Sequence, residues 1–170
     1  GPSGSLVIPG NHEMYSNGNA FYKNLLTAMY AHVDGIKKTQ KAGFFCLENE
    51  HWRIIGIDTG YTSVGHPLLE VAFSPDCALR QEQLDWLRDE VKLGDSSDKR
   101  GLIFLSHHPI ISGFRHSYNK PAEQIENLLG DAVRPVIWLW GHEHRLVWYK
   151  YQKVGKSFPI HGRCIGIGGM

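Results

Sequence analysis

Apolar and polar residues follow one another along the chain in blocks that predict strands separated by helices. Two continuous apolar runs, at residues 102–105 and 136–140, have the length and composition of strands buried on both faces of a largely parallel sheet. Residues 44–47 and 52–57 read as two further strands, and the polar residues 48–50 between them suggest a hairpin. These segments predict the centre of one sheet.

Further strand signals lie near the two ends of the chain. Residues 6–8 read as the tail of a strand that the Pro9-Gly10 pair ends. Residues 146–151 and 158–167 suggest a final pair around Val154-Gly155. The 170 residues contain no internal repeat, low-complexity tract or domain linker, so one domain accounts for all of these strands.

Three segments have the spacing of amphipathic helices, near residues 20–32, 80–93 and 121–130. The inward-facing residues that the spacing predicts are Phe21, Leu25 and Met29 in the first, Leu84, Leu87 and Val91 in the second, and Ile125, Leu128 and Leu129 in the third. This mixture of elements predicts an α/β fold with mixed sheets flanked by helices. The long loop at residues 58–76 favours a binding or lid role, although a loop that only covers the core fits as well.

Composition and charge exclude several functional classes. A formal net charge of +1 supplies no field that would recruit nucleic acid or an anionic membrane. No apolar run approaches the roughly 18 residues of a membrane span, and no signal peptide is evident. Cys46, Cys77 and Cys164 are odd in number and widely spaced, which favours free thiols in a reducing cytoplasm over disulfides or a zinc knuckle.

Both ends of the chain have an unusual composition. Residues 1–5 read as a cloning scar or linker, which leaves residues 6–170 as the domain. The chain closes inside a Gly-rich segment at residues 166–170. Both ends look cut, so we expect residues 6–170 to be a truncated domain.

Three polar motifs each follow a predicted strand. They are Gly10-Asn11-His12-Glu13, His107-His108-Pro109 and Gly141-His142-Glu143-His144. The ends of strands in an open α/β sheet deliver side chains to a shared crevice, and imidazole with amide groups there indicates a metal site. In an extended segment His142 and His144 project to the same side, so both rings would face one metal cluster.

The individual residues of these motifs leave alternatives open. Asn11 would offer an amide oxygen to a divalent ion, but it would equally stabilise a turn. His12 would act as a ligand or as a proton donor to a leaving alcohol. His107 would bind a metal or a backbone carbonyl, and His108 points to the opposite side if the segment stays extended, so at most one of this pair is expected to be a ligand.

Together the motifs resemble the calcineurin-like metallophosphoesterase superfamily. The resemblance rests on G-N-H-E, an apolar strand ending in H-H-P, and G-H-x-H, in that order, and it spans residues 7–169. The helical segment Gln83-Leu84-Asp85-Trp86-Leu87 is similar to the Q-x-x-W-L of many bacterial members, and Asp58 after a strand also fits. The resemblance implies part of a four-layer α/β/β/α sandwich.

The resemblance also implies roles for individual residues. Asn11, His107 and His142 would bind one metal ion, His144 would bind the other, and His12 would be the acid near the leaving group. Glu13 would be structural or would lie just outside the ligands. Two divalent or trivalent ions, of manganese, iron or zinc, would share a bridging hydroxide and carboxylate and act on a small phosphoester.

Two motifs that the superfamily places before G-N-H, D-x-H and G-D-x-x-D, are absent here. The resemblance therefore implies a chain that lacks the first strands, binds at most one metal weakly and hydrolyses slowly or not at all. Metal affinity should fall as the pH drops through about 6.5, because imidazoles bind metals in their neutral form. The exposed sheet edges would be covered by a second copy of the chain or by a complementing chain.

Other functions fit parts of the sequence. A non-catalytic scaffold that binds a partner protein through an exposed edge needs no retained metal. Residues 148–151, with Lys153 and Lys156, could stack and neutralise nucleic acid, although an ordinary edge hairpin explains them better. Further side chains that could meet a substrate phosphate or join the site, or lie on an ordinary surface, are Arg115, Arg145, Arg163 and His161. The choice between phosphomonoester and phosphodiester substrates stays open.

Overall fold

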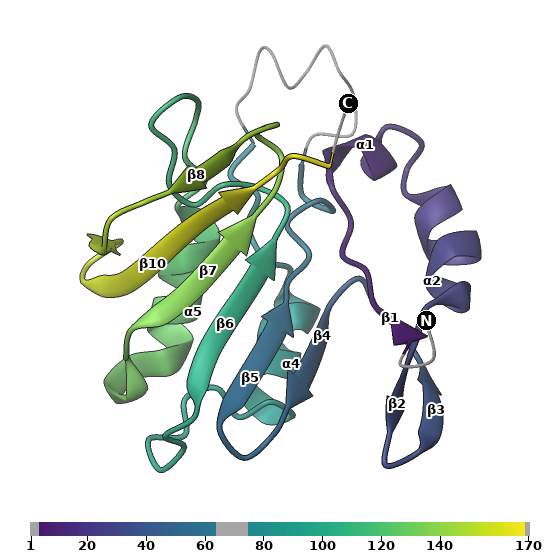
Figure 1. Cartoon of the computed structure of the whole chain (residues 1–170), viewed down its shortest axis with the longest axis horizontal. Helices are drawn as coiled ribbons and strands as arrows, with labels where there is room; N and C mark the ends of the chain where they lie inside the picture. Colours follow the sequence, from purple (N-terminus) through teal and green to yellow (C-terminus); the bar gives the residue numbers. More distant parts are fainter. Residues whose placement is uncertain (1–3, 64–74, 169–170) are drawn as a thin grey trace.

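The computed structural model describes residues 4–63 and 75–168. Its largest part is a seven-stranded mixed sheet in the order β4-β5-β6-β7-β10-β8, with β9 also paired to β10 (Figure 1). The strands are β4 (Phe45–Glu48), β5 (Trp52–Gly56), β6 (Gly101–Ser106), β7 (Val136–Trp140), β8 (Leu146–Trp148), β9 (Gln152–Val154) and β10 (Phe158–Ile165). Strands β5, β6, β7 and β10 run parallel, and β4, β8 and β9 pair antiparallel with their neighbours. The predicted α/β class and the β4–β5 hairpin are confirmed.

Two helices cover one face of this sheet. Helices α4 (Gln81–Asp89) and α5 (Lys120–Leu129) lie behind the strands in Figure 1, and the short helix η2 (Gly130–Ala132) follows α5. Phe104 of β6 and Trp138 of β7 are fully buried under them, with ring centroids 4.9 Å apart. The indole N–H of Trp138 donates to the hydroxyl of Ser106 at 3.0 Å, so its one polar atom is satisfied in the core. No described helix has the length and apolar character needed to span a bilayer.

The opposite face of the sheet is only partly covered. Ile54, Ile103 and Ile137 lie side by side on neighbouring strands and are half-buried. The prediction of strands buried on both faces is therefore wrong for the described chain: along β6 and β7, buried residues alternate with half-buried ones. At the β8 edge, Trp148 is 63% exposed. An apolar sheet face consequently remains in contact with water.

The N-terminal part differs most from the prediction. It contains β1 (Gly4–Ser5), α1 (Asn11–Met14), the π-helical turn η1 (Phe21–Leu25), α2 (Leu26–Ala28), β2 (Tyr30–Val33) and β3 (Ile36–Thr39). Strands β1, β2 and β3 form a second, small antiparallel sheet. The expected strand at residues 6–8 is wrong, because the strand lies at Gly4–Ser5 instead. The expected helix near residues 20–32 is confirmed as far as Ala28, but its last part is wrong, because a hairpin begins at Tyr30.

A π turn explains why the predicted helical face is wrong. The backbone N–H of Leu26 donates to the carbonyl of Phe21, five residues earlier. Phe21 and Leu26 therefore share the buried side, at 2% and 5% exposure, whereas Leu25 is 42% exposed. The extra residue in the turn rotates Leu25 away from the core.

Residues 6–9 connect the small sheet to the first motif without regular structure. The buried side chain of Gln40 replaces a strand partner there: its Oε1 accepts from Val7 N at 2.9 Å, and its Nε2 donates to Val7 O at 2.6 Å. The extended segment therefore has a fixed path, and it leads Gly10 and Asn11 toward the loops that follow β5 and β6.

We predict that Trp138→Ala lowers the free energy of unfolding by about 3–5 kcal/mol, since it leaves a cavity in the core. Trp148→Ala is the matched control, and it should cost less than about 1 kcal/mol because the ring is exposed. Urea denaturation followed by circular dichroism measures both. Equal losses for the two variants would contradict the assignment of the core.

Candidate metal centre

The three motifs meet where β6 and β7 end. The Nε2 atom of His107 lies 2.9 Å from Oδ1 of Asn11 and 3.1 Å from Nδ1 of His142. These residues are 96 and 35 positions apart in sequence, so the fold alone brings them together. The structure thus assembles the three residues that the resemblance assigns to one metal ion.

Contacts around Asn11 fix its side chain. Its Nδ2 donates to the hydroxyl of Tyr15 at 3.0 Å, which turns Oδ1 toward His107. Glu13 accepts from Gly10 N at 2.7 Å and so fixes the start of α1, a structural contact. Gly10 has to be glycine, because a Cβ there would lie 2.7 Å from the ring of His107.

His108 is closer to the cluster than the sequence suggested. Its ring centroid lies 4.9 Å from those of both His107 and His142. The expectation that His107 and His108 point to opposite sides is wrong, because the chain bends after β6. Thr59, which sequence reasoning missed, holds His108: its hydroxyl lies 3.0 Å from Nδ1 and accepts from His108 N at 3.2 Å.

The G-H-E-H segment is a tight turn, not an extended strand. His142 has a φ of 56°, in the left-handed region that non-glycine residues rarely adopt. Glu143 N donates to Gly141 O, and Arg145 N donates to Glu143 O, both at 2.6 Å. The expected extended conformation is therefore wrong, although His142 and His144 still line the same cavity, and the turn brings His142 to His107. A strained residue held in this way is typical of a functional site.

His12 and His144 are exposed and line one cavity of about 760 Å³ beside the cluster. The ring of His12 packs 5.0 Å from that of Tyr15. Tyr118, Arg115 and Arg145 line the same cavity. Sequence reasoning missed Tyr15 and Tyr118, because neither belongs to a motif and Tyr118 lies in a loop without periodicity.

Asp58 and Gln83 form a hydrogen-bonded network next to Thr59, the residue that contacts His108. Gln83, the first residue of the Q-x-x-W-L segment, accepts from Asp58 N at 2.8 Å and donates to Asp58 O at 3.3 Å. The carboxylate of Asp58 accepts from Tyr61 N and from the hydroxyl of Tyr22, both at 2.9 Å. Burial raises the pKa of Asp58 above its usual range, although these hydrogen bonds oppose the shift. These hydrogen bonds fix the backbone and side chain of Asp58, and they therefore also position Thr59, which is the next residue.

Burial keeps the central imidazoles neutral. It lowers the pKa of His107 to about 3 and that of His108 to about 2, and the neighbouring imidazoles lower both further. Neutral imidazole is the form that binds a metal. The expected loss of affinity near pH 6.5 therefore does not come from these two residues.

The donor atoms fit one metal ion. Two bonds of about 2.1 Å at right angles place their ligand atoms about 3 Å apart, close to the spacing around His107 Nε2. Imidazole nitrogens and an amide oxygen each have a lone pair that can bind a metal ion. Among the described residues, the one group of three or more His, Cys, Asp or Glu with this spacing is His107, His108 and His142. That group contains no carboxylate.

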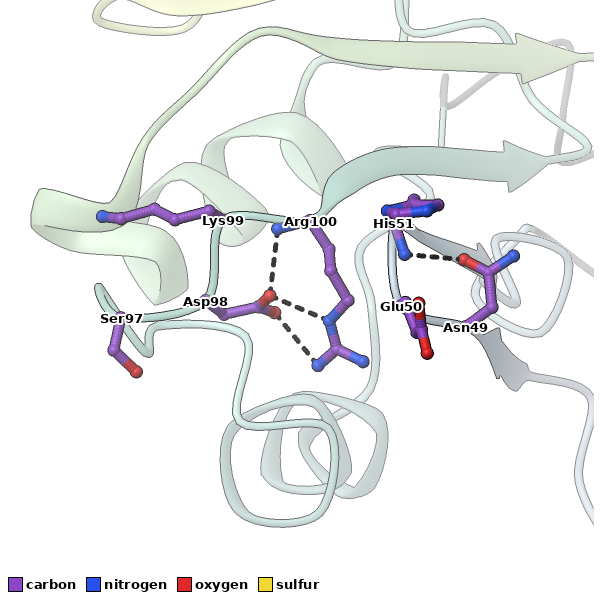
Figure 2. A pocket seen from close by; sticks show the side chains of 7 residues that line it. All are labelled: Asn49, Glu50, His51, Ser97, Asp98, Lys99 and Arg100. Carbon is purple, nitrogen blue, oxygen red and sulfur yellow. Dashed lines mark hydrogen bonds and ion pairs between the residues drawn. The ribbon is translucent and has the colours of Figure 1, made fainter.

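A second hollow lies at the other end of the parallel strands, before β5 and β6 begin. Figure 2 shows its lining, where Asp98 pairs with Arg100 at 2.8 Å and Asn49 accepts from His51 N at 2.8 Å. Asp98 also pairs with the buried Arg53 at 3.2 Å. These contacts stabilise the turns that precede β5 and β6.

Comparison with known proteins identifies the family. A sequence model of the protein family described as calcineurin-like phosphoesterase matches residues 3–146 of this chain. The chain belongs to the calcineurin-like phosphoesterase family. The resemblance that the motifs indicated is confirmed.

Members of this phosphoesterase family with curated names match at low identity. Over 162 residues the chain is 26% identical to an Arcobacter nitrofigilis protein named as a probable glycerophosphodiester phosphodiesterase, and the match covers 91% of this chain and 52% of that protein. Over 142 residues it is 28% identical to the 3′,5′-cyclic adenosine monophosphate phosphodiesterase of Escherichia coli, covering 81% of this chain and 42% of that enzyme. The chain spans about half the length of these relatives. No solved structure matches it.

We predict that His107→Ala and His142→Ala each lower the affinity for Mn²⁺ at least about tenfold, because each removes one of three donors. Asn11→Ala should have a smaller effect in the same direction. His51→Ala, at the opposite end of the sheet, is the control and should leave the affinity unchanged. Titration calorimetry measures these affinities, and equal values for His107→Ala and His51→Ala would refute the site.

A second prediction concerns the pH dependence of the metal-free chain. Because the pKa values of His107 and His108 lie near 3 and 2 when folded, and near 6.5 when unfolded, the unfolded state binds more protons between these values. The free energy of unfolding should therefore decrease as the pH falls from 6.5 toward 3. His108→Asn should reduce that slope. An equally steep slope in the variant would show that His108 is not buried in neutral form.

Proposed function

We propose that the chain is a metal-dependent phosphoester hydrolase, using the residues that converge on His107. The observation that carries this proposal is the pair of contacts that place Asn11 Oδ1 and His142 Nδ1 next to His107 Nε2, beside an open cavity. Family membership supports a hydrolytic reaction on phosphoesters.

In the proposed mechanism Asn11, His107 and His142 hold the ion. When bound, the ion would lower the pKa of a water molecule and offset charge on the phosphate oxygens. His12 is exposed on the cavity wall and would donate a proton to the leaving alcohol. Tyr15 links the two roles, since its ring packs against that of His12 and its hydroxyl accepts a hydrogen bond from Nδ2 of Asn11.

We further propose that the centre is dinuclear in the intact parent protein, with manganese, iron or zinc, and that His144 binds the second ion. The donors gathered here are neutral, and neutral donors offset the charge of a divalent cation poorly. This chain would therefore bind one ion weakly and hydrolyse its substrate slowly.

Phosphodiesters are the first substrate class to test. Both relatives are named as phosphodiesterases, one for glycerophosphodiesters and one for cyclic adenosine monophosphate. The cavity lined by Arg115 and Arg145 is open to a small phosphoester. Phosphomonoesters are the alternative.

A scaffold that binds a partner protein is the second candidate function. The half-buried face around Ile103 and Ile137, with exposed Trp52 and Trp148, favours it. The same face would suit a second copy of the chain or a complementing chain. The scaffold predicts that purified protein carries no bound transition metal.

We expect Mn²⁺-loaded chain to hydrolyse bis(p-nitrophenyl) phosphate, with p-nitrophenyl phosphate as the monoester comparison. His107→Ala should lower kcat/KM at least about a hundredfold, and His12→Asn should lower kcat about tenfold to a hundredfold by removing the proton donor. His51→Ala is the control. Activity that survives His107→Ala would refute this site, and wild-type protein that binds no metal and turns over nothing would favour the scaffold.

A further inference from the structure

A closed loop follows the H-H-P motif and leads into the cavity. Tyr118 N donates to Pro109 O at 2.8 Å, which closes the neck of the loop. Within it, Ser112 N donates to Ser117 Oγ at 2.9 Å. The hydroxyl of Ser112 accepts from Phe114 N at 3.0 Å and from Arg115 N at 2.8 Å. We call residues 109–118 the 109–118 loop.

Two contacts join the 109–118 loop to the G-H-E-H turn. Ser112 Oγ donates to the carboxylate of Glu143, whose side chain is buried. The guanidinium of Arg145 stacks 4.2 Å from the ring centroid of Phe114. The hydroxyl of Ser112 thus accepts two backbone hydrogen bonds from the segment that carries Arg115, and it donates one hydrogen bond to Glu143. The position of Arg115 therefore depends on the carboxylate between the two turn histidines.

The cavity wall built in this way carries positive charge that no carboxylate of the described residues neutralises. Arg115 and Arg145 both line it, and among the described residues neither forms a salt bridge. Nε of Arg145 is buried and has no hydrogen-bond acceptor in the described chain. Glu13, the acidic residue of the cavity lining, already binds Gly10 N. A buried donor without an acceptor is costly.

We propose that Arg115 and Arg145 bind the phosphate oxygens of the substrate, and that Glu143 is a positioning residue that holds Arg115 in place through Ser112. The ligand class is a phosphate group, because a guanidinium fork matches its oxygens and its charge. The identity of the substrate as a phosphoester rests on the proposed function. The binding of a phosphate group by the two arginines does not depend on that function.

Inorganic phosphate and the metal-free protein provide the first test, since they require no turnover. Arg115→Ala should weaken phosphate binding, measured by titration calorimetry, at least about tenfold. Arg88→Ala, which removes an exposed arginine of α4, is the matched control and should have no effect. Failure of wild-type protein to bind phosphate, or equal binding by the Arg115→Ala variant, would overturn the proposal even if hydrolysis is observed.

A double-mutant cycle tests the role of Glu143. Glu143→Ala and Ser112→Ala should each weaken phosphate binding several-fold and leave Mn²⁺ affinity within about twofold. In the Arg115→Ala background, Glu143→Ala should add almost nothing, because the group it positions is gone. Glu143→Gln keeps an acceptor for Ser112 and should restore most of the affinity. If Glu143→Ala unfolds the chain, Ser112→Ala and Glu143→Gln carry the test.

Additive losses in the cycle would overturn the positioning role, as would loss of Mn²⁺ affinity equal to the loss of phosphate affinity. In active protein, Arg115→Ala should raise KM for the phosphodiester with a smaller change in kcat. Phosphate binding that depends on Arg115 in a chain that never hydrolyses a phosphoester would refute the proposed function and leave this inference standing.

Discussion

The contact of one half-buried imidazole nitrogen with two other lone-pair donors is the interaction on which the site depends. His107 Nε2 lies between Asn11 Oδ1 and His142 Nδ1. Two nitrogens with facing lone pairs repel unless a proton or a cation lies between them. One proton on Nε2 of His107 can form a hydrogen bond in one of these two contacts, whereas a cation can bind all three donor atoms at once. Burial disfavours the imidazolium form of His107, so the ring stays neutral, which is the form that offers a lone pair to a cation.

Much of the surrounding structure fixes these three donors in place. Thr59 binds His108, Gln83 holds the backbone of Asp58 beside Thr59, and Gly60 packs so closely on Gly10 that a Cβ would lie 2.6 Å from the Gly10 carbonyl oxygen. The left-handed His142 adds strain that a tightly packed neighbourhood has to offset. The glutamine of the Q-x-x-W-L segment thus has a structural role, because Gln83 binds the backbone of Asp58 just after β5 and so fixes the loop that contacts His108.

The sequence predicted the centre of the fold well, because the runs at 102–105 and 136–140 have one physical explanation, which is burial in a sheet. It failed at residues 30–39, where Asp34 and Gly35 have φ values of 52° and 75° and join β2 to β3. Such an Asp-Gly pair favours a two-residue hairpin turn, and the helical spacing of Phe21, Leu25 and Met29 obscured it. The candidate ligands were visible as motifs. Thr59, Tyr15 and the Ser112–Glu143 link were not, because they depend on tertiary contacts between residues without a shared pattern.

Spectroscopy of the nitrogen ligands of bound Mn²⁺ tests the central claim most directly. Electron spin echo envelope modulation of Mn²⁺ bound to the wild-type chain should detect imidazole nitrogens, and His142→Ala should reduce their number by one. His51→Ala should leave the spectrum unchanged. Mn²⁺ coordinated by water and carboxylate oxygens alone, with no imidazole signal, would contradict the account.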